Sequence, residues 1–108
     1  MHVDPPRILT QLPVKLTWNE GDSKELTCIT DGKPKPRVTW KRDDSILMQA
    51  RQIAKVVFQS VTYKEAGLYK CLAENAGGRK QKYVQVNVLC KFDGIIFQNF
   101  YVIFVINS

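Results

Sequence analysis

The chain has 108 residues, of which 44% are hydrophobic and 24% charged, and its formal net charge is +6. The length suits a single domain, and the composition is that of a globular protein, which excludes a disordered chain. The positive charge favours contact with polyanions, but it is equally typical of a basic surface exposed only to water.

The cysteines and the histidine limit which metal sites and disulfides the chain could form. The chain has three cysteines, Cys28, Cys71 and Cys90, and one histidine, His2. No two cysteines have C-x-x-C spacing, so we expect no metal site, and the odd count predicts one disulfide and one free thiol. Residues 1–6 are polar and proline-rich, without the apolar segment of a signal peptide. The chain is then either a fragment of a longer secreted protein or a cytosolic module.

Alternating apolar and polar residues predict short β-strands along the chain. Residues 24–30 alternate, a turn rich in proline and glycine follows at 31–36, and residues 37–41 form a second half-buried strand. Residues 68–73 and 81–88 flank a further turn, so we expect a hairpin there. No window has the 3.6-residue period of a helix. Many short strands with frequent turns predict an antiparallel sandwich or barrel.

Four residues make this pattern specific: Cys28, Trp40 twelve residues later, Tyr69 and Cys71. Together with the glycine and prolines before Trp40 and the run Glu-Ala-Gly-Leu-Tyr-Lys-Cys at 65–71, they resemble the I-set of the immunoglobulin superfamily. The resemblance implies an all-β fold, an antiparallel two-sheet immunoglobulin-like β-sandwich with Greek-key topology. We expect the domain at residues 7–89, after an N-terminal arm at 1–6.

The resemblance also gives these residues their roles. Cys28 and Cys71 would form a disulfide between the sheets, and Trp40 would pack against it. The Tyr69 hydroxyl would bond to the backbone near residues 62–65, in what is known as a tyrosine corner.

Two features depart from the family pattern. Glu65 stands where the run usually has aspartate. In the family this acid pairs with an arginine, which would be Arg51 here. The interval from Trp40 to Cys71 is short, which favours abbreviated strands and a compact domain without the two extra strands of a variable domain.

The segment at 90–108 has a different character. Four of the five phenylalanines lie in it, and its apolar run at 95–106 is interrupted by Gln98 and Asn99. The run is shorter than the roughly 20 residues of a membrane-spanning helix. Three interpretations remain: a terminal extension foreign to the domain, an extra strand or linker, and a membrane-surface anchor. We expect the first, with the domain core ending near Leu89.

Catalysis is not supported by the sequence. The only imidazole lies in the N-terminal arm, there is no glycine-rich phosphate loop, and Asp43 and Asp44 fit a solvated turn better than an acid–base pair. No nucleic-acid-reading motif accompanies the positive charge. We therefore expect a binding module with no enzymatic activity, cofactor, small-molecule substrate or nucleic-acid partner.

Two classes of binding function fit the resemblance. One is a recognition module of a cell-surface adhesion or receptor protein, and the other is an intracellular structural module, as in giant muscle proteins. The cysteines at bridging positions favour an oxidising compartment. We therefore expect an extracellular location, as part of a larger protein.

Strand alternation also predicts where a partner would bind. One sheet should expose an apolar surface among lysines, a usual interface composition, and we expect contact with a homophilic or heterophilic protein partner there. The predicted contact residues are Lys41, Lys70, Leu72 and Tyr83. A rival site is a basic cluster that would bind heparan sulfate-like chains, as in a growth-factor-type receptor. Its residues are Lys33, Lys35 and Arg37, with Lys41, Arg42, Arg79, Lys80 and Lys82 as further candidates.

Overall fold

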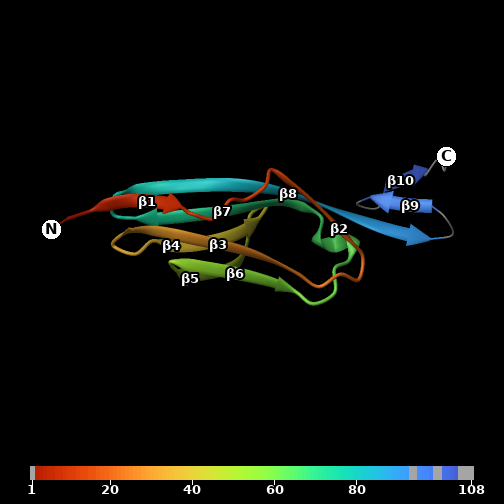
Figure 1. Ribbon diagram of the computed structural model, residues 1–108, viewed down its shortest axis with the longest axis horizontal. Helices are drawn as coiled ribbons and strands as arrows, with labels where there is room; N and C mark the ends of the chain where they lie inside the picture. Colours follow the sequence, from red (N-terminus) through yellow and green to blue (C-terminus); the bar gives the residue numbers. More distant parts are fainter. Residues whose placement is uncertain (1, 93–94, 99–100, 105–108) are drawn as a thin grey trace.

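The computed structural model describes the backbone of residues 2–92, 95–98 and 101–104, with side chains as far as Cys90. In chain order these residues form β1 (Asp4–Ile8), β2 (Lys15–Asn19), β3 (Lys24–Lys33), β4 (Arg37–Arg42), β5 (Ser45–Arg51), β6 (Ile53–Phe58), the short 3-10 helix η1 (Tyr63–Glu65), β7 (Gly67–Asn75), β8 (Gly78–Phe92), β9 (Ile95–Gln98) and β10 (Tyr101–Phe104) (Figure 1).

The strands form two sheets that lie face to face (Figure 1). The smaller sheet has the order β1-β3-β6, and the larger has the order β10-β9-β8-β7-β4-β5, with β2 also paired to β8. The β2–β8 pair is parallel, and the other pairs are antiparallel. This confirms the predicted two-sheet immunoglobulin-like sandwich and the hairpin of β7 with β8.

The short interval between Trp40 and Cys71 comes from a missing strand. An immunoglobulin constant-type sandwich has a four-stranded sheet facing a three-stranded one. Here β6 ends the smaller sheet, and the chain passes to it from β5 through the single residue Gln52, at φ 71°. The expected shortening of the strands is therefore wrong: β5 has seven residues and β6 has six. The interval is short because, within the described residues, the chain forms no strand beside the outer edge of β6, where a constant-type sandwich has its fourth strand.

The core lies between the sheets and follows the predicted alternation. Inward residues two apart along β3, β4, β7 and β8 are fully or almost fully buried, which is how a pleated strand covers a core. The buried cluster comprises Trp18, Leu26, Cys28, Val38, Trp40, Ala54, Val61, Tyr69, Cys71, Val84, Val86 and Val88.

The expected disulfide has formed at the centre of this cluster. Cys28 on β3 and Cys71 on β7 are bonded, with their Cα atoms 6.5 Å apart, and Cys90 is free. Trp40 is fully buried in the same cluster, and its indole N–H donates a hydrogen bond to the Ala54 carbonyl oxygen at 3.0 Å. The buried ring therefore has its one polar group satisfied.

The strands extend beyond the domain limits expected from alternation. β1 begins at Asp4, and Pro6 is fully buried, although the sequence placed both in an arm. Because β1 is an edge strand, its prolines interrupt no central ladder. At the other end β8 continues to Phe92, and β9 and β10 extend the larger sheet past the end of the sandwich (Figure 1). Within the described residues, no helix has the length and apolarity needed to cross a membrane.

Candidate binding surfaces

The outward surface of the larger sheet carries the predicted contact residues. Strand register arranges them in rows across β5, β4, β7 and β8. In one row Ile46 lies opposite Lys41, Lys41 opposite Lys70, and Lys70 opposite Tyr83. Three of the four predicted contact residues are therefore cross-strand neighbours.

This row combines apolar ends with a basic middle. The exposed fraction is 56% for Ile46 and 47% for Tyr83, and the two lysines between them are half-buried. Lys70 Nζ lies 6.0 Å from the centroid of the Tyr83 ring, at the distance of a cation–π contact. Exposed apolar side chains surrounded by charge have the composition of a protein interface.

In the next row across the sheet, the side chains cover one another and leave little surface for a partner. Thr39 is only 3% exposed, and its hydroxyl accepts a hydrogen bond from Gln49 Nε2 at 3.2 Å. Leu72, opposite Thr39, is half-buried, so it offers a partner less surface than its outward position implied. Leu68 on the same strand is 44% exposed and offers more.

Ile46 and Leu68 were not among the predicted contacts. Leu68 follows the same alternation along β7 as the residues that were chosen, so its signal was present in the sequence. Ile46 is different, because an irregularity brings it to this face: Trp40 pairs with Met48, but the next residue, Lys41, pairs with Ile46. Such a bulge leaves no mark in an alternation pattern.

A third row, nearer the β7–β8 turn, consists only of charged residues. Arg37 lies opposite Arg51 on one side and opposite Glu74 on the other, and Glu74 lies opposite Arg79. Arg79 Nη2 and Glu74 Oε2 form an ion pair at 3.1 Å. Among the described residues Arg37 and Arg51 have no ion pair, and like charges directly across a ladder destabilise the strand pair.

The predicted pairing of Arg51 with Glu65 is therefore wrong. Arg51 pairs with Arg37 at the β7–β8 turn end of β4, while Glu65 belongs to η1 near the opposite end. There the arginine is Arg42, whose Nη1 donates to the Lys64 carbonyl oxygen at 2.6 Å. The Glu65 carboxylate instead accepts hydrogen bonds from the Thr62 backbone N–H and hydroxyl, at 3.0 and 2.6 Å.

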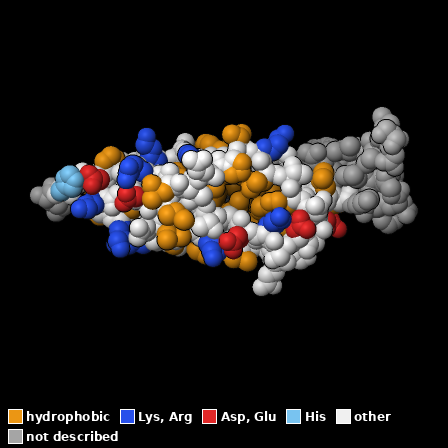
Figure 2. All heavy atoms as spheres, viewed as in Figure 1, with side chains coloured by type: hydrophobic (Ala, Val, Ile, Leu, Met, Phe, Trp, Pro, Cys, Tyr) orange, Lys and Arg blue, Asp and Glu red, His pale blue; other side chains and the backbone are white. Residues whose placement is uncertain are grey.

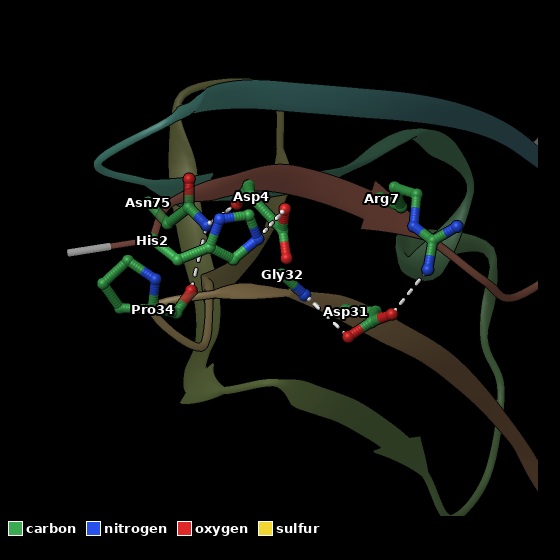
Figure 3. Close-up of polar contacts among 7 residues, drawn as sticks. All are labelled: His2, Asp4, Arg7, Asp31, Gly32, Pro34 and Asn75. Atoms are coloured by element: carbon green, nitrogen blue, oxygen red, sulfur yellow. Dashed lines mark hydrogen bonds and ion pairs between the residues drawn. The ribbon is translucent and has the colours of Figure 1, made fainter.

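The end of β3 at Lys33 and the loop that bears Lys35 are held in place by Asn75. The Asn75 Nδ2 donates to the Asp4 carbonyl oxygen at 2.7 Å and to the Pro34 carbonyl oxygen at 2.9 Å (Figure 3). Gly32 approaches this amide so closely that a Cβ there would lie 2.9 Å from Asn75 Nδ2. One amide thus ties β1, the loop and the β7–β8 turn together, and fixes the backbone that carries the two lysines.

Acidic side chains at this end of the sandwich are already engaged. Arg7 Nη2 contacts Asp31 Oδ2 at 2.6 Å, and His2 Nε2 contacts Asp4 Oδ1 at 2.9 Å (Figure 3). The hydrogen bond from Arg7 holds the pKa of the Asp31 carboxyl below its usual value. Asp4 also lies opposite Lys33, and the charge of Lys33 contributes to the lowered pKa of Asp31. Basic side chains gather among these acids at the end near the N terminus (Figure 2).

Of the other candidates for the basic cluster, Arg79 shares the row of Arg37, and the remaining four lie apart from it. Lys41 and Arg42 are at the far end of β4 from Arg37. Lys80 and Lys82 lie opposite Ala73 and Cys71, two inward-facing residues of β7, so they belong to the other side of the sheet. No group of three or more His, Cys, Asp or Glu side chains that could hold a metal ion occurs within the described part of the chain.

The sandwich, its buried bridge with Trp40, and the Tyr69 corner define an immunoglobulin-like domain. The chain belongs to the immunoglobulin I-set domain family, whose pattern matches residues 6–88. Domains of this family are generally non-enzymatic binding modules.

Curated relatives and solved structures agree with this assignment. The chain is 34% identical to myelin-associated glycoprotein of Mus musculus over 78% of this chain and 14% of the relative, and 32% identical to hemicentin-1 of Homo sapiens over 82% and 2%. The match thus spans a small part of each relative. The immunoglobulin complex of titin M10 and obscurin-like 1 matches 82% of this chain and 98% of the solved chain, with a TM-score of 0.70 and 26% identity. Sidekick-1 immunoglobulin domains 1–5 match 83% of this chain and 21% of the solved chain, with a TM-score of 0.70 and 27% identity.

Proposed function

We propose that this domain is a non-catalytic recognition module of a cell-surface adhesion or receptor protein, and that it binds a protein partner through the outward surface of the larger sheet. The contact residues are Ile46, Lys41, Lys70, Tyr83 and Leu68, with Leu72 at their edge. The observation that carries the proposal is the row in which two exposed apolar side chains flank two half-buried lysines.

The residues of this surface would contribute to binding in different ways. Tyr83 offers a large, rigid ring with few rotamers to fix, and tyrosine is enriched among residues that dominate interface affinity. Lys41 and Lys70 would instead raise the rate of encounter with an acidic partner surface, an effect that falls as salt is added. The formed Cys28–Cys71 bridge supports an oxidising compartment.

The test compares binding by the domain with binding by surface variants. Homophilic binding is measured by sedimentation and by aggregation of beads coated with the domain, and heterophilic binding against an array of cell-surface ectodomains. Tyr83→Ala and Ile46→Ala should each weaken the recorded binding at least about tenfold. The matched control is Val57→Ala, which removes an exposed apolar side chain from the smaller sheet.

Three outcomes decide the matter. Loss with Tyr83→Ala and retention with Val57→Ala supports the sheet surface. Equal loss of binding in Tyr83→Ala and Val57→Ala overturns the proposal. Normal binding by both Tyr83→Ala and Ile46→Ala also overturns it. Lys41→Glu should slow association more than it speeds dissociation, and the difference should shrink at high salt.

A structural role inside cells is a second candidate, favoured by the likeness to the titin M10–obscurin-like 1 immunoglobulin complex. The two candidates differ in the state of the cysteines. Protein isolated from its native source without reductant should show one titratable thiol under the cell-surface proposal. Three thiols would instead support a reducing compartment, because Cys28 and Cys71 would then be unbridged.

A further inference from the structure

The arginine pair formed by Arg37 and Arg51 is an unusual feature of the larger sheet. These residues are direct cross-strand partners, and like charges so placed destabilise the pair of strands. The chain supplies acids to other cations nearby, with Asp31 at Arg7 and Glu74 at Arg79. Among the described residues neither Arg37 nor Arg51 has an ion pair, although Glu74, the ion-pair partner of Arg79, also lies opposite Arg37.

Three surface hollows extend from this arginine pair to Lys33 and Lys35. One of about 330 Å³ is lined by Gln49, Ala50, Arg37 and Arg51. The next, of about 350 Å³, shares both arginines and adds Lys35 and the acid Glu74. The third, of about 630 Å³, shares Lys35 with the second and adds Lys33, together with Asp4, Asp31 and Arg7. Neighbouring hollows therefore share basic lining residues, and we call Arg51, Arg37, Lys35 and Lys33 the basic track.

The basic track is built on a fixed backbone. Arg37 and Arg51 stand on paired strands, Lys33 ends β3, and Lys35 stands on the loop held by the hydrogen bonds of Asn75. Charges held in position lose less freedom when a ligand arrives than charges on a mobile loop. Among the described residues none of the four side chains has an ion pair, so binding would break no ion pair of theirs.

We propose that the basic track binds a sulfated polysaccharide. Four cations along neighbouring hollows suit an extended chain that carries repeated anionic groups, and a guanidinium group can donate two parallel hydrogen bonds to two oxygens of one such group. None of the exposed large hydrophobic residues lines the three hollows. A protein segment would be expected to insert such anchors, since aromatic and apolar residues dominate protein interfaces, whereas a polysaccharide needs none.

The experiment measures binding of a heparin-type oligosaccharide to the whole chain at about 0.15 M salt. Arg51→Gln, Arg37→Gln and Lys35→Gln should each weaken binding by about fivefold or more and flatten its salt dependence. Lys24→Gln is the matched control, because Lys24 begins the strand that ends at Lys33 and the substitution removes the same charge. It should change affinity less than about twofold.

A second readout separates binding from folding. Arg51→Gln should raise the denaturation midpoint of the free protein, because it removes the cross-strand repulsion with Arg37. The oligosaccharide should raise the midpoint of the unsubstituted protein and lose that effect in the variant. A lowered midpoint in the free variant would contradict the repulsion on which the assignment rests.

Further measurements distinguish binding at the basic track from a net-charge effect, from binding of acidic protein segments, and from binding at the protein-binding surface. Equal loss of affinity in Lys24→Gln would reduce the effect to net charge and overturn the proposal. Poly-glutamate of equal charge binding as tightly as the oligosaccharide would assign the track to acidic protein segments instead. Tyr83→Ala should bind the oligosaccharide normally, so this proposal and the one for the protein-binding surface can fail separately.

Discussion

The Tyr69 hydroxyl donates a hydrogen bond to the backbone carbonyl oxygen of Glu65, four residues before it. The ring is fully buried and meets Phe58 edge-on, with the ring centroids 6.0 Å apart. Arg42 reaches the same hydroxyl with its Nη1 at 3.3 Å. Tyr69 thus closes the turn between η1 and β7 from inside the core, and confirms the tyrosine corner predicted from the sequence.

Tyr69→Phe should lower the free energy of unfolding by about 1 kcal/mol or somewhat more, because the Glu65 carbonyl loses its donor in a partly buried place. Chemical denaturation monitored by tryptophan fluorescence gives the value. Tyr83→Phe, which removes a hydroxyl from an exposed ring, is the control and should change stability by less than about 0.5 kcal/mol. An unchanged midpoint in Tyr69→Phe would show that the corner is not stabilising.

The sequence could predict this corner because its residues are adjacent in the chain. The bridge and Trp40 were predictable for another reason: Cys28, Trp40 and Cys71 are far apart in the chain, but their spacing matches the family pattern. The partner of Arg51 could not be predicted in this way. It depends on the strand beside β4, and the chain turns from β5 into β6 through Gln52 without the strand that the family pattern led us to expect.

The capping of η1 gives a second prediction. The Thr62 hydroxyl accepts a hydrogen bond from the Lys64 backbone N–H at 3.2 Å, while Glu65 accepts two from Thr62. Thr62→Ala should therefore destabilise the domain by about 1 kcal/mol, within the usual range for loss of such a cap. Glu65→Gln keeps a hydrogen-bond acceptor and should cost less. A larger loss in Glu65→Gln than in Thr62→Ala would mean that the carboxylate charge matters more than the cap.

The disulfide should be a major source of stability. Cys28 and Cys71 are 43 positions apart, and closing a loop of this length stabilises the folded state by about 4 kcal/mol in the chain-entropy model. Replacing both cysteines by alanine should lower the free energy of unfolding by about that amount. Urea denaturation of the variant against the oxidised protein measures the difference. A loss below about 1 kcal/mol would show that burial of Trp40 holds the sheets together without the bridge.

Placement of the outward surface was predictable only where strands are regular. Alternation along β7 and β8 set Lys70 and Tyr83 on one face, and the structure places them opposite each other because the hairpin keeps one register from Gly67 to Asn75. It failed at β5, where the bulge opposite Lys41 moves Ile46 to this surface. It also could not show that Gln49 covers Thr39, since that depends on which strand is the neighbour of β4.

The C-terminal segment provides a prediction about domain limits. β9 pairs with residues Leu89 to Phe92 of β8, and β10 pairs with β9. The buried core, among the side chains described, reaches no further than Val88 with Cys90 packed at its margin. A chain ending at Cys90 should therefore unfold cooperatively with a midpoint close to that of the full chain, and should be more soluble. Loss of cooperativity in circular dichroism melts would show that the segment completes the core.

The Cys90 thiol should react slowly with alkylating agents, although its side chain is not fully buried. Its Sγ donates a hydrogen bond to Glu20 Oε2 at 2.8 Å. Burial, followed by this contact with a carboxylate, raises the pKa of the Cys90 thiol to about 11. Because only the thiolate reacts, alkylation at pH 8 should be about 100-fold slower than for a cysteine with the ordinary pKa near 8.5. The other two cysteines are bridged, so the measured rate belongs to Cys90 alone.

The direction of the pH dependence follows from the same contact. The reaction rate should keep rising as pH increases past 8.5 and level off only near 11, since the thiolate forms late. Glu20→Gln removes the carboxylate charge, so it should lower the pKa and increase the rate at pH 8. Unfolded protein in denaturant is the control and should react at the ordinary rate. A rate in the folded protein that levels off near pH 8.5 would show that neither burial nor Glu20 acts on this thiol.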